Sequence, residues 1–191
     1  MAAFGPNAML HAQFPTPIIR QELQKSIENK ALADIDDSKT TVLVVTGSKD
    51  KEKNADIVIA FAKWSHPVLP GEDYMEPAWV WPEGTDLKVL EAWTAKAAEA
   101  ESRSIGDAPC YRLTFIGTDP AYGHQGAGHL LLKWGIEQCH GNGSPLYLES
   151  CSYSMNGNLN KAPRFGKVED FNKNEYELYK LHSRIDGIEF F

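Results

Sequence analysis

The sequence predicts an α+β domain in which helices flank a mixed, mainly antiparallel β-sheet. Two adjacent runs rich in β-branched and apolar residues, 40–46 and 56–64, enclose the charged loop GSKDKEKNA, which is typical of an antiparallel hairpin. Helix-like and strand-like segments then alternate along the rest of the chain. A length of 191 residues with 42% apolar and 24% charged residues fits a single globular domain, residues 1–191.

The first element is an amphipathic helix. Thr16 is expected to be its N-cap, because Pro17 is suited to the first helical position. Ile19, Leu23 and Ile27 recur at four-residue intervals and form one apolar face. The two hairpin strands follow this helix.

The segment 65–85 contains several prolines and aromatic residues, and we expect an ordered loop rather than a linker. Thr85 or Asp86 then caps a helix over 86–104, which Gly106 ends. The residues expected on one face of this helix are Leu90, Trp93 and Ala97.

The second half of the chain predicts a strand at 111–118, a helix at 126–140 closed by Gly141 and Gly143, and a strand at 145–151. Beyond Cys151 the composition is rich in Asn, Lys and Gly. The segment NEYELYKLH (174–182) can be helical, and IDGIEFF reads as a last strand. The sequence shows neither repeats nor a second domain.

Composition excludes several classes of function. A net charge of −7 and a pI near 5.4 disfavour nucleic-acid binding, which usually needs a basic face, whereas they suit cationic partners such as amines. No apolar stretch reaches membrane-spanning length, and the start MAAFGPNAML lacks the features of a secretory signal. Three cysteines without metal-site spacing predict neither a metal site nor a disulfide framework. We therefore expect a cytoplasmic protein.

A glycine-rich segment, GTDPAYGHQGAGHLLLKWG, joins the strand at 111–118 to the next helix, with glycines at 123, 126 and 128. Unpaired backbone N–H groups at a helix start, together with the helix dipole, suit phosphate binding, and glycines allow close approach. The pattern matches neither a Walker loop nor a Rossmann fingerprint, because His129 and Leu131 stand where Lys and Gly are required. The alternative is a plain turn that requires positive φ.

The stretch YRLTFIGTDPAYGHQGAGHLLLKWG closely resembles the core motif of the GNAT family of acetyl-CoA-dependent N-acetyltransferases. In that family a strand ends in a segment like V-x-P-x-Y, followed by Q/R-x-x-G-x-G/A and a helix. The segments IVIAFAKWSHP and PLYLESC resemble the flanking strands of these enzymes, most closely those of fungal members. The resemblance covers roughly residues 4–151, with gaps.

The resemblance implies that acetyl-CoA is the cosubstrate and that a primary amine, on a small molecule, attacks its thioester directly, without a metal. The strands at 111–118 and 145–151 would splay apart to admit the thioester. The edge of the first strand would pair with the pantetheine arm, and the backbone of the following loop would hold the pyrophosphate. The cofactor-binding residues implied are Ile116, Gly117, Thr118, His124, Gln125, Gly126, Ala127, Gly128 and His129.

The chain departs from the family pattern in its charges. Gly123 stands at the family's first Gln or Arg, and Gln125 replaces the usual basic residue before the second glycine. The loop would therefore hold phosphate through backbone N–H groups and the helix dipole rather than through cations.

The family's catalytic acid is a Tyr in an L-Y motif that protonates the leaving thiolate. Leu178-Tyr179 matches this motif if residues 152–173 are an insertion, and Tyr153 is the alternative. Each tyrosine can instead be a packing residue. Tyr179 is the candidate that we adopt, at the start of the expected last helix.

The candidates for the general base are Asp119, Glu149 and His66. The alternatives for them are a turn or cap residue, an exposed strand residue and an ordinary loop histidine, respectively. A chain of water molecules can also carry the proton away.

Two other functions remain open at this stage. One is a catalytically degenerate CoA-binding or interaction protein, favoured by the altered loop, the displaced tyrosine and ends that look shortened relative to the family. The other is a structural domain without a CoA site. The sequence leaves the acceptor amine and the oligomeric state open, a homodimer included.

Overall fold

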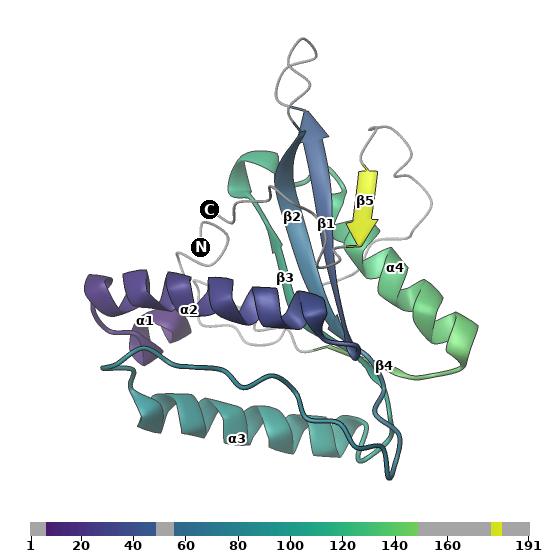
Figure 1. Ribbon diagram of the computed structural model, residues 1–191, viewed down its shortest axis with the longest axis horizontal. Coiled ribbons are helices and arrows are strands. Elements are labelled where there is room, and N and C mark those ends of the chain that lie inside the picture. Colours follow the sequence, from purple (N-terminus) through teal and green to yellow (C-terminus); the bar gives the residue numbers. More distant parts are fainter. Residues whose placement is uncertain (1–6, 49–55, 149–176, 181–191) are drawn as a thin grey trace, which may run out of the picture.

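The computed structural model describes residues 7–48, 56–148 and 177–180, which form one mixed, mainly antiparallel sheet with helices around it (Figure 1). The order of the strands across the sheet is β4-β3-β2-β1-β5. This α+β architecture is the one that the sequence predicts. The strands are β1 (Thr40–Ser48), β2 (Asp56–Ser65), β3 (Tyr111–Thr118), β4 (Leu146–Leu148) and β5 (Glu177–Lys180). The helices are α1 (Ala8–Gln13), α2 (Pro17–Asp36), α3 (Leu87–Ser104) and α4 (Ala127–Asn142), with a 3-10 turn at Pro120–Tyr122.

The expected hairpin is confirmed. β1 pairs antiparallel with β2 along its whole length, and β2 pairs antiparallel with β3. β4 pairs parallel with β3, from Tyr111↔Leu146 to Leu113↔Leu148. A parallel neighbour requires a crossover connection, and α4 supplies it.

Side chains that alternate along β1 and β2 divide between two helices on opposite faces of the sheet. Leu43 and Val45 lie in a core cluster with Leu131 of α4, and all three are almost fully buried. Val42 and Val44 face the other way and pack with Ile35 of α2. The result is a three-layer arrangement of α2, sheet and α4 (Figure 1).

Helix α2 begins as the sequence predicts. Thr16 is its N-cap, since its Oγ1 accepts a hydrogen bond from the backbone N–H of Ile19 at 3.2 Å, and Pro17 is the first helical residue. Leu23 is buried on the expected apolar face.

Helix α3 lies beside α1, away from the central sheet, and the segment 66–86 runs back along it (Figure 1). Asp86, one of the two expected caps, accepts a hydrogen bond from Val89 N–H at 3.1 Å. The segment 66–86 is ordered rather than a linker: Trp79 donates to Ser26 Oγ of α2 at 3.0 Å and stacks on Trp81 with ring centroids 4.5 Å apart.

The expectation of a helix over 174–182 is wrong for the residues that can be described. Glu177–Lys180 form strand β5, which pairs antiparallel with β1 through Val44↔Tyr179 and its neighbours. Without this partner, β1 would present an open row of backbone N–H and C=O groups at the edge of the sheet. Pairing along that edge therefore outweighs the local helical pattern.

Candidate functional site

The end of β3 is positioned by two irregularities of the sheet, one between β1 and β2 and one in β3 itself. Between Val45 and Thr46 the β1–β2 register shifts and leaves Ile59 without a Cα partner; the carbonyl of Ile59 accepts a hydrogen bond from Asp119 N–H at 2.8 Å. This contact fixes the first residue after β3 against the sheet. Bulges of this kind redirect the chain and are common beside functional sites.

A second shift lies within β3 itself. Lys63 pairs with Phe115 and Trp64 pairs with Leu113, so Thr114 is the extra residue of a bulge. The pairing of β3 with β4 is described as far as Leu113, which is the residue before this bulge. Since a bulge bends its strand, β3 changes direction at Thr114, within the pair of strands that the resemblance expects to splay apart. The splay itself stays a prediction, because β4 is described only to Leu148.

After β3 the chain makes a compact turn into α4. The Asp119 side chain accepts from Ala121 N–H at 2.9 Å and so caps the 3-10 turn at Pro120–Tyr122. His124 then adopts φ 60°, and Gly126, the N-cap of α4, adopts φ 91°. No side chain caps α4 at this end; the Gly126 carbonyl accepts from the N–H groups of His129 and Leu130. The first N–H groups of α4 therefore lack a side-chain acceptor.

Helix α4 is held firmly against the sheet. Its buried residues recur every four positions: Ala127, Leu131, Gly135 and Cys139. Gly135 lies directly against the indole of Trp64, a residue with no exposed surface. A helix fixed in this way keeps its N-terminus in a constant position relative to the end of β3.

The two glycines at the start of α4, Gly126 and Gly128, differ in whether the fold requires glycine at that position. Gly126 needs the left-handed conformation of the turn, so the turn alone explains it. Gly128 has no positive φ, and a Cβ there would meet only Thr118 Oγ1, at an ordinary 3.8 Å. The fold therefore does not require glycine at 128. A glycine beside an uncapped helix N-terminus and the end of β3 leaves space for a ligand to approach the backbone.

The charge of the loop is low. No lysine or arginine occurs from 117 to 129, and His124 and Gln125 are exposed. The residues that the resemblance assigns to the cosubstrate lie in two stretches on either side of the 3-10 turn. Ile116, Gly117 and Thr118 end β3, and the residues from His124 to His129 form the turn and the first positions of α4; Gly117 and Ala127 are buried. The uncapped N–H groups and the open space at Gly128 fit a pyrophosphate held by backbone alone.

Two of the candidate bases have described positions. Asp119 lies at the loop, exposed, and its role as a cap of the turn is confirmed. His66 follows β2, at the end of the sheet where β3 begins, and its Nε2 lies 2.8 Å from Thr41 Oγ1 while its ring contacts Tyr111. His66 is thus remote from the loop along the length of β3, as the loop-histidine alternative expects.

The remaining candidates divide into two groups. Glu149 and Tyr153 lie outside the described residues. Tyr179 lies in β5, at the edge of the sheet opposite β4, with β1 and β2 between β5 and β3. Strands are spaced about 4.8 Å apart, so the backbone of Tyr179 lies roughly 14 Å from that of β3. The strand position gives no support to a thiolate donor at this residue.

Sequence reasoning missed a buried charge cluster on the α2 face of the sheet. Asp34 of α2 forms ion pairs with Lys30, one turn earlier, and with Lys63 of β2 at 2.9 Å. Glu76, from the segment 66–86, pairs with Lys63 at 2.9 Å and with Lys30 at 3.2 Å. Lys30, Asp34 and Lys63 are each less than 7% exposed. The cluster therefore fastens the segment 66–86 to α2 and the sheet.

These contacts set the pKa values of the groups. Burial alone would raise the pKa of Glu76, but hydrogen bonds and charge attraction from Lys63 and then Lys30 outweigh it, and the pKa lies below its ordinary value. Asp37 behaves in the same way: hydrogen bonds from Tyr74 and Thr40 outweigh burial, and its pKa is lowered. Burial, followed by the hydrogen bond to Asp37, raises the pKa of Tyr74.

The cysteines are core residues where they are described. Cys110 and Cys139 are buried and unbonded, and burial raises the pKa of both thiols. They are therefore poor nucleophiles at neutral pH. Cys151 lies outside the described residues. Within the described ranges no cluster of His, Cys, Asp or Glu is arranged to hold a metal ion.

The fold and the loop together define an α+β protein in which a helix without a side-chain N-cap begins beside a bulged strand. Comparison with protein-family models, with curated proteins and with solved structures finds no match to this chain. None of the helices in the described part of the chain is both long and apolar enough to cross a membrane.

Proposed function

We propose that this protein is an acyl-CoA-dependent N-acyltransferase that moves an acetyl group from acetyl-CoA to a primary amine on a small molecule. The proposal combines the resemblance of residues 111–135 to the GNAT core motif with the geometry of the same residues. In this proposal the protein has the GNAT type of fold, and the pantetheine arm of acetyl-CoA lies along the edge of β3.

The observation that carries the proposal is Gly128. The fold has room for a side chain at this position, and the helical backbone tolerates one, yet the residue is glycine. It stands in the first turn of α4, where Gly126 provides no side-chain cap, and next to Thr118 at the end of β3. An anion bound by the backbone N–H groups would occupy this open space.

The chain's own residues would then bind, orient and manage protons. The thioester supplies an activated acyl carbon when acetyl-CoA is bound. The N–H groups at the start of α4 hold the phosphates, and the backbone of Ile116–Thr118 aligns the acyl arm. Asp119, the exposed residue that directly follows β3, accepts the proton of the attacking amine directly or through water. The proposal does not employ Tyr179, because β5 lies at the far edge of the sheet.

A catalytically degenerate CoA-binding protein is the second candidate. The absence of lysine and arginine from 117–129 favours it, because phosphate then lacks a cationic partner in this segment.

Release of free thiol from acetyl-CoA, measured with a panel of primary amines, tests the proposal. Amine-dependent release that is lost on heating the protein supports transfer. Binding of acetyl-CoA without release of thiol in the presence of any amine supports the catalytically degenerate CoA-binding protein. If acetyl-CoA neither binds nor releases thiol, both candidate functions are excluded.

A further inference from the structure

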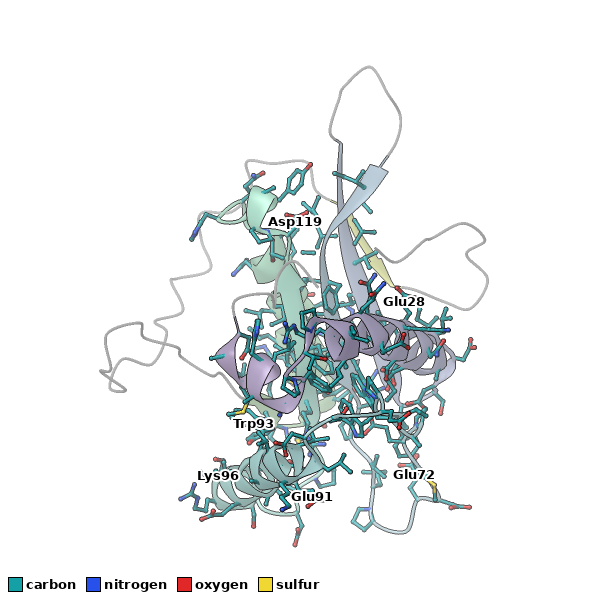
Figure 2. All side chains as sticks on the ribbon, turned by 90° about the vertical axis from the view of Figure 1, so that its left-hand side faces the viewer. Glu28, Glu72, Glu91, Trp93, Lys96 and Asp119 are labelled. Carbon is teal, nitrogen blue, oxygen red and sulfur yellow. The ribbon has the colours of Figure 1, made fainter. Side chains whose placement is uncertain are left out.

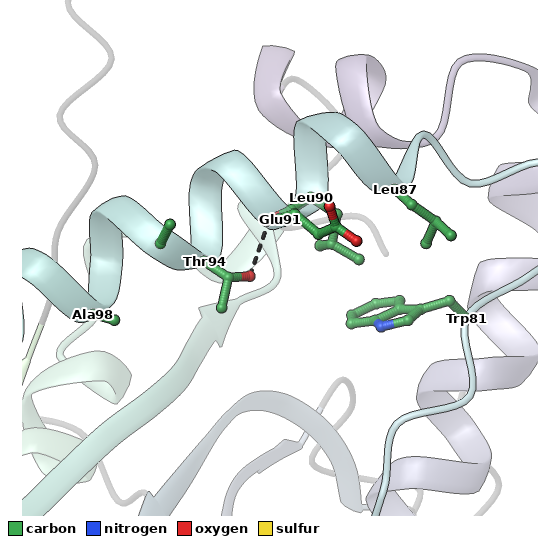
Figure 3. A pocket seen from close by; sticks show the side chains of 7 residues that line it. Trp81, Leu87, Leu90, Glu91, Thr94 and Ala98 are labelled. Carbon is green, nitrogen blue, oxygen red and sulfur yellow. Dashed lines mark hydrogen bonds between the residues drawn. The ribbon is translucent and has the colours of Figure 1, made fainter.

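A hollow of about 520 Å³ lies between α3 and the segment 66–86 (Figure 3). It is open to solvent, since Leu87, Glu91, Thr94 and Ala98 are exposed residues of α3. It lies away from the loop: Figure 2 shows Glu91 on α3 near the bottom of the molecule and Asp119, after β3, in its upper part. The residues that line it are Trp81, Leu87, Leu90, Glu91, Thr94, Ala95 and Ala98.

The walls of the hollow are mostly apolar. Leu87 and Leu90 lie on one turn of α3, and the indole of Trp81 lies across from them (Figure 3). The hydroxyl of Thr94 donates to the carbonyl of Leu90 at 2.9 Å, so its proton is already used within the helix. Such walls favour a ligand with an apolar or aromatic body.

Glu91 is the single charged residue among those that line the hollow. Its carboxylate extends into the same space as the Trp81 ring (Figure 3), and it forms no ion pair with any residue in the described ranges. A carboxylate and the face of an indole both attract an organic cation. The net charge of −7 acts in the same direction.

The two sides of the hollow are held in place by contacts elsewhere. Trp81 stacks on Trp79 and contacts Phe14, with ring centroids 4.5 Å and 6.0 Å away. At the start of α3, Asp86 N–H donates to Gln13 O at 2.8 Å, and near its end Glu101 pairs with Arg112 of β3. These contacts hold Trp81 and the backbone of α3 in place, which lowers the cost of ordering the site on binding.

We propose that this hollow binds an organic ammonium ion with an aromatic or alkyl body, with Glu91 as its counter-charge and Trp81 as its aromatic wall. The ligand class follows from the combination of apolar walls with one carboxylate that has no ion pair among the described residues. The assignment does not depend on acyl transfer, because binding is measurable in the absence of CoA.

The test compares 4-phenylbutylamine with the neutral 4-phenylbutanol by isothermal titration calorimetry on the full chain at low salt. We expect the amine to bind about tenfold more tightly than the alcohol, as a charged hydrogen bond would contribute. Glu91→Gln should remove this preference. Glu99→Gln, an exposed position on the same helix that pairs with Arg103, makes the same change in net charge and should leave the preference intact.

A second variant tests the location. Thr94→Phe places a ring in the hollow and should weaken both probes. Circular dichroism confirms that each variant keeps its helices. No binding of the amine to the wild type, equal binding of amine and alcohol, or a preference that survives Glu91→Gln would each overturn the proposal, and full binding by Thr94→Phe would overturn the location.

Discussion

Replacing Gly135 by alanine tests the packing of α4, the helix that carries the candidate site. A Cβ at this position would lie 2.7 Å from Cε2 of Trp64 and closer still to Cζ2 and Cη2. Carbon atoms pack at about 3.5–4.0 Å, so the indole or the helix would have to move by about 1 Å or more. Trp64 has no exposed surface and Gly135 is buried, so neither moves easily.

The expected magnitude follows from two opposing effects. Alanine gains about 1 kcal/mol over glycine in a helix interior, whereas overpacking of this severity costs about 3 kcal/mol. The free energy of unfolding should therefore fall by about 2 kcal/mol, which lowers the Tm by roughly 4–8 °C for a chain of this length.

Gly141, also in α4, is the matched control. A Cβ there meets nothing within 4 Å, so Gly141→Ala should leave stability unchanged or raise it by up to about 1 kcal/mol. Urea unfolding of both variants gives the two signs directly. Trp64→Phe removes the clashing benzo ring, so Gly135→Ala should cost about 1 kcal/mol less in that background. A Gly135→Ala variant as stable as the wild type would refute the contact between α4 and Trp64.

The other predictions concern the charge cluster, the loop and β5. Asp34→Asn should destabilise the protein by about 3–5 kcal/mol, because it leaves two buried lysines short of a counter-charge, whereas exposed Asp36→Asn should change stability by less than about 0.5 kcal/mol; chemical denaturation measures both. The pKa of Glu76 is lowered from 4.5, so the ionised carboxylate should stabilise the protein fully above that pH and progressively less below it. This part of the loss of stability at low pH should be missing from a Glu76→Gln variant when the free energy of unfolding is measured against pH. Gln125→Arg should tighten acetyl-CoA binding by about 1 kcal/mol in calorimetry, and unchanged affinity would mean that the side chain points away from the phosphates. Tyr179→Phe should leave the rate of thiol release unchanged because of its place in β5, and a large loss of rate would restore it as the acid.

The parts of the fold that the sequence predicted are those with local signals. Thr16 before Pro17 marks the start of α2, and Asp86 marks the start of α3. Alternation and β-branched residues predicted the hairpin of β1 and β2, and the bounds of β3 agree with the structure. Helix α1 was missed because six residues capped by Asn7 carry too little periodicity.

The unpredicted parts depend on partners distant in sequence. Lys30 and Asp34 continue the buried face of α2 after Leu23. From the sequence alone, charged residues are expected to face solvent, because the ion pair of Asp34 with Lys63 of β2 joins residues that are distant in sequence. Residues 174–182 have a helical pattern, but the open edge of β1 pairs with Glu177–Lys180 instead. The bulge at Thr114 likewise arises from the register with β2, which no local pattern specifies.

For the candidate site, the sequence located the glycine loop but did not separate the roles of its glycines. The positive φ of Gly126 and the open space at Gly128 are visible only in three dimensions. This distinction makes Gly128 the position at which ligand binding and folding can be separated. Substitution of Gly126 would strain the turn itself, so a loss of ligand binding could not be distinguished from a loss of folding.

Phosphate binding at the start of α4 is best tested by the affinity for acetyl-CoA of the wild type, Gly128→Val and Gly141→Val, measured by isothermal titration calorimetry. Both variants place the same side chain on α4 where a Cβ has room, and both should remain folded. We predict that the wild type and Gly141→Val bind equally well. Gly128→Val should bind at least about tenfold more weakly, because its methyl groups occupy the space needed for phosphate to reach the backbone N–H groups. Equal affinity of all three proteins, or no binding by the wild type, would show that the backbone at Gly128 does not hold the phosphates of acetyl-CoA.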